Sequence, residues 1–179
     1  MKEKKRNLLK MLAEELLLSE DIDRAEFFTA EELEAPVDIT RAVVTELGAE
    51  LISVLAEFYF MPFENEDMLY FSNVITITDD IRDDEKADLA LAVAGLNYHL
   101  PCGCFALNDT ADMLVYRYTV PILADQDETA IKKIMLTSVD AAINTADSFE
   151  SYLMLVLEGN MTPEEMIKMI KGNANNDEA

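Results

Sequence analysis

The sequence predicts an α+β protein with five mainly antiparallel strands and with helices packed on one face of the sheet. Apolar residues alternate at period two along the centre of the chain, a pattern typical of strands with one buried face. Towards the C-terminus they recur every three or four residues, which is typical of an amphipathic helix. Half of the 179 residues are apolar, so the chain can build one sizeable hydrophobic core.

Residues 1–38 are predicted to precede the main domain. From residue 4 to residue 18, leucine and methionine recur at helical spacing, which predicts an amphipathic helix. An acidic connector follows over 19–38. Within it, Thr29 and Glu32 have the spacing of a capping box, which predicts a short helix that ends before Pro36.

Three strands are predicted at the start of the main domain, which spans residues 39–172. They cover 41–47, 52–60 and 68–78. A helix is the competing interpretation for 49–57, because alanine, glutamate and leucine favour helices. The aromatic run at 58–60 favours the strand.

A helix and two further strands come next. The helix is expected to start at Asp83 or Asp84 and to end at Tyr98. The two strands cover 102–107 and 113–122, and they flank a turn rich in asparagine and aspartate.

A long helical pattern occupies residues 127–158. An unbroken helix of this span would be ~48 Å long, whereas a compact domain of this size is only about 40 Å across. Either the helix breaks near 137–138, or one end projects and packs on something else. A capping box with proline at 162–165 then predicts a helix that ends at Gly172. The polar residues 173–179 are expected to form a disordered tail.

The charge distribution limits the class of partner. The chain has 14 Lys and Arg against 36 Asp and Glu, a net charge of −22. Five of these cations lie in the first ten residues beside one acid, which leaves nine cations against 35 acids from residue 11 onward. So acidic a body repels phosphate backbones, which argues against nucleic-acid binding and favours partners that are basic, apolar or unfolded. We interpret the basic first turn as solvated rather than membrane-bound.

The sequence shows no secretory signal and no membrane-spanning segment. Lys10 and Glu14 interrupt the apolar residues near the N-terminus. The apolar run at 152–157 is far shorter than the ~20 residues that span a bilayer. Two cysteines do not make a disulfide framework. We therefore expect a cytoplasmic protein without membrane insertion.

The most distinctive motif lies between residues 96 and 121. It combines a helix-ending asparagine, a proline and a glycine that lead into the fourth strand, and a proline in the fifth: Asn97, Pro101, Gly103 and Pro121. Pro101 prevents the helix from continuing, and Gly103 suits a bulge or a close backbone approach.

With these residues and the strand at 113–118, the chain resembles the YbjN-like family, often described as regulators of sensory transduction. That family has the type III secretion chaperone-like fold. The resemblance implies the order α-β-β-β-α-β-β-α, here with extra N- and C-terminal helices. It also implies a role in protein interaction or regulation, with no reaction attached.

Four residues of the last two strands are the predicted binding residues: Phe105, Tyr116, Arg117 and Tyr118. The three rings supply apolar area to the sheet. Arg117 is a candidate for binding an acidic group. The competing interpretation, which we favour, pairs this arginine with a neighbouring acid.

Soft metal ligands occur together at His99, Cys102 and Cys104, and they suit zinc or copper. A tetrahedral site would lack one ligand, although a regular strand would place both cysteines on the same face. We interpret the cysteines as small apolar residues of a buried strand and expect no metal or other cofactor. The aspartate clusters at 79–88 and 125–128 lack the glycine of calcium loops and are interpreted as helix N-terminal acids.

Nucleophile-elbow, P-loop and dinucleotide-binding motifs are absent from the sequence. We therefore predict a non-catalytic protein-binding module, chaperone-like or regulatory, with an unidentified protein partner. A homodimer is expected, because the apolar seam of 127–158 is longer than one domain needs. The alternatives are a small metal or redox protein that uses the His99 cluster, a small-molecule sensor, and an apolar surface that serves the dimer alone.

Overall fold

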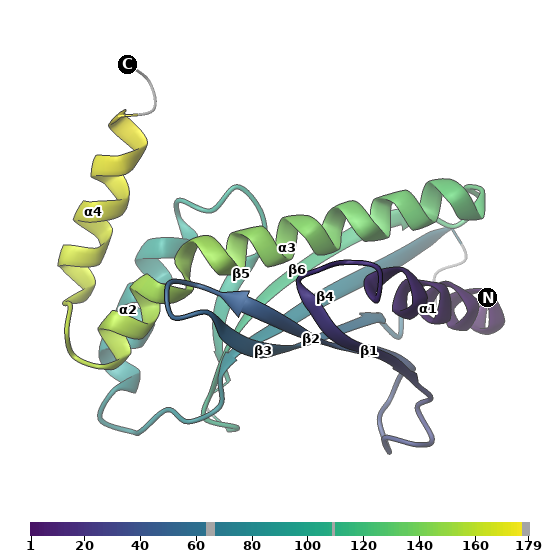
Figure 1. Cartoon of the computed structure of the whole chain (residues 1–179), viewed down its shortest axis with the longest axis horizontal. Coiled ribbons are helices and arrows are strands. Elements are labelled where there is room, and N and C mark those ends of the chain that lie inside the picture. The colour runs from purple at the N-terminus through teal and green to yellow at the C-terminus, as the bar shows by residue number, and fades with distance from the viewer. Residues whose placement is uncertain (64–66, 109, 177–179) are drawn as a thin grey trace.

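The computed structural model describes residues 1–63, 67–108 and 110–176, which fold into one sheet and four helices (Figure 1). The strands are β1 (Ile22–Phe28), β2 (Ile39–Leu47), β3 (Ile52–Phe60), β4 (Met68–Thr78), β5 (Cys104–Asn108) and β6 (Met113–Leu123). The helices are α1 (Lys2–Leu16), α2 (Lys86–Asn97), α3 (Glu128–Leu157) and α4 (Pro163–Asn176).

The strands form one antiparallel sheet in the order β1-β2-β3-β4-β6-β5. The predicted α+β class and antiparallel sheet are confirmed, but the sheet has six strands instead of five. The additional strand is β1, whose residues the sequence assigns to an acidic connector. Its pattern is weak because only Ile22 and Ala25 are buried and a β-bulge between Ile22 and Arg24 interrupts the alternation.

Helices α1 and α3 cover one face of the sheet (Figure 1). Two hydrogen bonds mark this face. Thr40 Oγ1 donates to the Leu9 carbonyl of α1 at 2.7 Å, and Asn73 Nδ2 donates to Ser138 Oγ of α3 at 3.3 Å. Because side chains alternate along a strand, the intervening residues point to the opposite face. None of the described helices covers that opposite face (Figure 1).

Helix α1 belongs to the same hydrophobic core as the sheet. Its buried residues are Leu8, Leu9, Leu12, Ala13 and Leu16. Some basic residues of α1 also contact the chain, so the first turn is solvated only in part. Lys4 Nζ donates to the Ala124 carbonyl at 2.9 Å, and further along the helix Lys10 Nζ lies 5.4 Å from the centre of the Phe27 ring.

Helix α3 is continuous over its 30 residues, without a break at Thr137 or Ser138. The Asp127 side chain caps it by accepting the Ala130 N–H at 2.9 Å. The predicted apolar seam of this helix is confirmed. Its buried residues include Ile131, Met135, Val139, Ala142, Ala146, Leu153 and Val156. At ~45 Å the helix projects past the sheet, and its C-terminal part packs on α2 and α4 (Figure 1).

The two predicted capping boxes have different outcomes. Thr162 and Glu165 form the expected reciprocal hydrogen bonds at the start of α4, with Thr162 N donating to Glu165 Oε2 at 2.9 Å. Thr29 and Glu32 form the same bonds, but the residues after Thr29 make only a turn. The predicted short helix is therefore wrong, and Glu34 with φ of 50° ends that turn.

Two helix boundaries differ from the prediction. Helix α2 begins at Lys86, after Asp83 and Asp84, and Asp83 Oδ1 instead accepts from Lys86 Nζ at 2.8 Å. Helix α4 continues to Asn176, so residues 173–176 are helical rather than disordered. The rest of the predicted tail, 177–179, lies outside the described residues. None of the described helices has the length and apolar character that crossing a membrane requires.

Candidate functional site

The sequence motif around residues 97–105 holds edge strand β5 in place. The Asn97 side chain makes two hydrogen bonds with the backbone of Phe105. Phe105 N donates to Asn97 Oδ1 at 2.8 Å, and Asn97 Nδ2 donates to Phe105 O at 2.9 Å. The amide thus substitutes for a neighbouring strand at the edge of the sheet. We call this pair of hydrogen bonds the Asn97 latch.

Gly103 allows the backbone to approach Tyr116 closely, as the sequence predicts. Its φ of +65° lies in the left-handed region. A Cβ atom at this position would lie 2.2 Å from Tyr116 Oη and 2.7 Å from the Arg117 carbonyl oxygen. The Tyr116 hydroxyl donates to the Cys102 carbonyl at 2.9 Å, which fixes the chain on the other side of Gly103.

Pro121 occupies a position of β6 where no strand needs its N–H. Strand β5 pairs with β6 only as far as Cys104 opposite Arg117, so β6 has a free edge beyond that pair. On the other side, Pro121 lies opposite Tyr70 of β4. The Tyr70 carbonyl accepts from Met61 N on the β3 side, so Tyr70 and Pro121 form a non-hydrogen-bonded pair. The missing donor therefore faces the free edge.

The four predicted binding residues lie on opposite faces of the sheet. Phe105 and Tyr116 are 1% and 0% exposed, and their ring centres are 5.1 Å apart in the core. Tyr118 is half-buried on the same face and packs against the core. Arg117 is exposed on the opposite face. No residue in the described ranges forms an ion pair with Arg117, so the favoured pairing with an acid is not found.

Arg117 belongs to the face of the sheet that the described helices leave uncovered, which we call the open face. It includes Arg24, Glu26, Phe28, Ile39, Arg41, Val43, Thr45, Ser53, Leu55, Glu57, Tyr59, Met68, Tyr70, Ser72, Val74, Thr76, Cys104, Ala106, Asn108, Met113, Val115, Arg117, Thr119, Pro121 and Leu123. Its charged residues are three arginines and two glutamates. The open face therefore carries a net charge of +1, on a chain whose net charge is −22.

The arginines of the open face differ in their surroundings. Arg41 Nε donates to Glu57 Oε1 at 2.8 Å, and its guanidinium carbon lies 5.7 Å from the centre of the Phe28 ring. Arg24 and Arg117 lie on either side, separated by four strand spacings, or about 20 Å. Between them lie apolar side chains, of which Leu55 is 40% exposed. Arg24, Arg41 and Leu55 line a shallow hollow of about 170 Å³.

The sequence interpretation missed Arg24 and Arg41. A signal was available for Arg41, because it alternates with the apolar residues of β2 and so had to lie on the less buried face. For Arg24 there was none, because β1 itself was not predicted.

The candidate metal ligands do not converge. Cys102 Sγ lies 3.7 Å from Tyr116 Oη, whereas Cys104 lies on the open face opposite Arg117. The interpretation of both cysteines as residues of a buried strand is wrong, because Cys104 is exposed and Cys102 precedes β5. The two cysteines therefore do not share a face, because the left-handed backbone at Gly103 interrupts the strand alternation. The His99 ring packs against Tyr98, with ring centres 5.2 Å apart. Within the described ranges, no three His, Cys, Asp or Glu side chains are placed to hold a metal ion.

One buried carboxyl group lies where helix α3 meets the β2–β3 turn. Glu150 is 2% exposed, next to Gly48. Gly48 N donates to Asp147 Oδ1 and Ala49 N donates to Ser151 Oγ, both at 2.8 Å. Burial raises the pKa of Glu150, and the Ser151 hydroxyl, which donates to Glu150 at 2.9 Å, opposes that shift. We therefore expect the junction of α3 and the turn to respond to protonation of Glu150.

Glu150→Gln is expected to make the protein more stable near neutral pH. In the folded state Glu150 holds its proton more tightly than in the unfolded chain. The free energy of unfolding of the wild type therefore falls as the pH rises above the ordinary pKa of 4.5. Glutamine removes this dependence and can still accept from Ser151. The gain over wild type should be small at about pH 4 and larger at about pH 7, measured by urea denaturation.

The control is Asp140→Asn, which removes one negative charge from the exposed side of the same helix. The difference in free energy of unfolding between Asp140→Asn and the wild type should not grow from about pH 4 to about pH 7 as it does for Glu150→Gln. A gain of Glu150→Gln that is equal at both pH values would contradict the role of Glu150 burial.

No family model matches the chain, and no curated protein or solved structure is significantly similar to it. The architecture of a six-stranded antiparallel sheet with four helices therefore stands on the structure alone.

Proposed function

We propose that this chain is a non-catalytic protein-binding module, chaperone-like or regulatory, and that it contacts its partner through the open face. The observation that carries the proposal is a complete sheet face that the described helices leave uncovered and whose local charge is opposite to that of the chain. A sheet buried on one side only ordinarily carries polar residues on the other. Here Val43, Leu55, Val74 and Val115 lie among them.

The charges of the open face indicate the chemistry of the partner. Elsewhere the chain repels acidic molecules, but at this face an apolar contact can form with little repulsion. Arg41 is already paired with Glu57, whereas Arg24 and Arg117 flank the apolar centre about 20 Å apart. The partner that fits is a protein with an apolar surface and with carboxylates on either side of it, at the spacing of these arginines.

The resemblance to the YbjN-like family and the type III secretion chaperone-like fold supports the same class of function. Asn97 and Gly103 hold β5 in place beside β6, and Pro121 lies in β6 beyond the end of β5. These motif residues therefore serve the fold rather than bind a partner. Strand β1 lies outside the order that the resemblance implies, and it widens the open face by one strand.

A homodimer is the other candidate for this surface. The sequence predicts a homodimer because the apolar seam of α3 is longer than one domain needs. In the structure, however, the sheet, α2 and α4 of the same chain cover that seam. Two open faces packed together would also bring two bodies of charge −22 into contact. We therefore favour a different protein as the partner, and the test below separates the two.

Leu55→Asp should prevent partner binding, because it places a carboxylate in the apolar centre of the open face. The matched control is Leu91→Asp on the outer side of α2, where the leucine is 63% exposed. In affinity capture from the native cell extract, the partner should be retained by the wild type and by Leu91→Asp and lost with Leu55→Asp. With the purified partner, calorimetry should then show a loss of at least about tenfold in affinity, or ~1.4 kcal/mol.

Arg24→Glu/Arg117→Glu should weaken the same complex and reduce its dependence on salt. A partner lost equally with Leu55→Asp and Leu91→Asp would exclude the open face as its site. Light scattering that gives about twice the chain mass of 20.1 kDa for the wild type, and the monomer for Leu55→Asp, would instead assign the open face to a homodimer.

A further inference from the structure

A cavity of about 730 Å³ lies at the N-terminal end of α1, away from the open face. Its walls are α1, the loop between β1 and β2, and the start of the β3–β4 connection. Its apolar lining includes Leu9, Val37, Phe60 and Phe63. This volume is within the range of sites that bind small molecules, and such sites are mostly apolar with a few polar groups.

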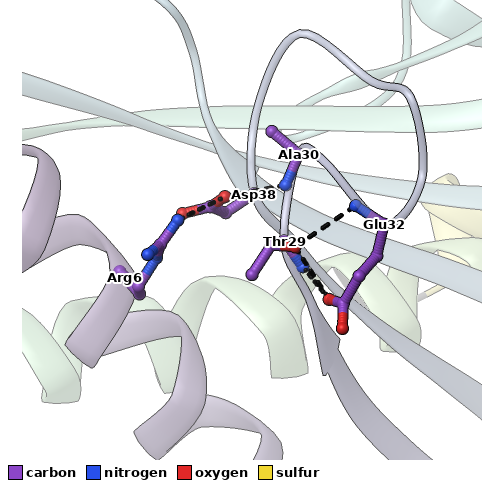
Figure 2. A network of polar contacts seen from close by, with 5 residues as sticks. All are labelled: Arg6, Thr29, Ala30, Glu32 and Asp38. Atoms are coloured by element: carbon purple, nitrogen blue, oxygen red, sulfur yellow. Dashed lines mark hydrogen bonds and ion pairs between the residues drawn. The ribbon is translucent and has the colours of Figure 1, made fainter.

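A network of polar contacts holds the loop wall of this cavity against α1 (Figure 2). Arg6 Nε donates to Asp38 Oδ2 at 3.0 Å, and Ala30 N donates to Asp38 Oδ1 at 2.8 Å. Burial acts to raise the pKa of Asp38, but the Arg6 hydrogen bond and charge and the Ala30 N–H together hold that pKa below its ordinary value. Thr29 and Glu32 close the turn beside Ala30 (Figure 2). The wall is thus fixed by interactions within the chain, and Asp38 is already neutralised.

Two further cations line the cavity, Lys2 and Lys5. The other basic residues of α1 have partners elsewhere, since Lys4 donates to Ala124 O and Lys10 lies over Phe27. Lys5 Nζ donates to the Met61 carbonyl at 3.3 Å, which uses one of its three N–H groups. Burial lowers the pKa of Lys5, as expected for an ammonium group that lacks a buried counterion.

We propose that this cavity binds a small amphipathic carboxylate, whose apolar part contacts Leu9, Val37 and Phe60 and whose head group pairs with Lys2 and Lys5. Charge complementarity carries the assignment. The charged side chains of the described lining are Lys2, Lys5 and Asp38, which sum to +1, and Asp38 is also paired with Arg6 beside the cavity. The cavity is therefore positive on a chain of net charge −22. An anion is therefore attracted to this cavity, and the apolar lining selects one with an apolar tail.

The test uses the full chain and decanoate as the probe, with isothermal calorimetry and decanol as the uncharged analogue. Decanoate should bind at one site per chain, and decanol should bind at least about tenfold more weakly. Lys5→Gln should weaken decanoate binding by about tenfold, and Lys2→Gln/Lys5→Gln should weaken it further. Lys10→Gln, which removes a positive charge from the same helix outside the cavity, should leave the affinity unchanged.

Val37→Trp provides a second test, because a larger side chain fills the cavity without changing its charge. It should abolish decanoate binding while the far-UV circular dichroism stays that of the wild type. Leu55→Asp should bind decanoate normally, which separates this site from the open face. The proposal is overturned if decanoate and decanol bind equally, if Lys10→Gln weakens binding as much as Lys5→Gln does, or if the wild type shows no saturable binding.

Discussion

Gly103→Ala is expected to destabilise the protein by about 3 kcal/mol, with a range of roughly 2–5 kcal/mol. Two costs combine at this position. Alanine pays for the left-handed backbone conformation, since φ is +65°. Its Cβ would also lie 2.2 Å from Tyr116 Oη and 2.7 Å from the Arg117 carbonyl oxygen, which forces β5 away from β6. The free energy of unfolding, measured by urea denaturation, checks this prediction.

The matched control is Gly172→Ala in α4, where a Cβ would meet no atom of the described residues within 4 Å. It should leave stability unchanged or raise it by up to about 1 kcal/mol. Tyr116→Phe removes the hydroxyl oxygen nearest to the new Cβ, so the double variant should be less destabilised than the sum of the single variants. Additive effects would show that the contact with Tyr116 is not the cause.

Asn97→Ala is expected to cost about 3 kcal/mol, because it removes both hydrogen bonds of the Asn97 latch. Phe105 is buried, so its N–H and C=O groups would lose their partners in a place that water reaches poorly. Asn97→Asp should cost less than alanine but more than about 1 kcal/mol. Aspartate can still accept from Phe105 N, but it has no N–H to donate to Phe105 O.

Hydrogen exchange gives a second measurement of the Asn97 latch. The amide of Phe105 should exchange faster in both Asn97 variants, while the amides of β3 in the centre of the sheet keep their protection relative to global stability. The control is Asn144→Ala, an exposed asparagine in α3 whose loss should change stability by less than about 0.5 kcal/mol. Unchanged protection of Phe105 in Asn97→Ala would contradict the role of the latch.

The positions of the cations connect the two proposed binding surfaces. The chain has 14 basic residues against 36 acids, and several of its basic side chains form ion pairs. Among the described residues, Arg24 and Arg117 on the open face and Lys2 and Lys5 at the cavity form no ion pair with a carboxylate. Other basic residues serve the fold, for example Lys132, which pairs with Glu15 and joins α3 to α1. Each surface is thus a local exception in an acidic chain.

The sequence by itself determined the elements whose residues repeat in a regular pattern. The alternation along 52–60 and 68–78 and the seam of α3 were sufficient, because burial of one face selects the period of 2 or 3.6 residues. The backbone role of Gly103 was also predictable, since few other residues allow the conformation that it adopts.

Tertiary structure decided which face of each strand is covered and which segments join the sheet. Tyr116 is buried and Arg117 is exposed because α3 lies on one face of the sheet only. The residue pattern of β6 does not predict which helix covers that face. Strand β1 forms because β2 offers it an edge, although its own residues are mostly polar. Cys102 and Cys104 separate because one left-handed residue reverses the alternation between them. The cavity beside Lys5 forms where α1, a loop and β3 meet. It could not be predicted from the sequence, because contacts between segments distant in the chain produce no periodic pattern of residues.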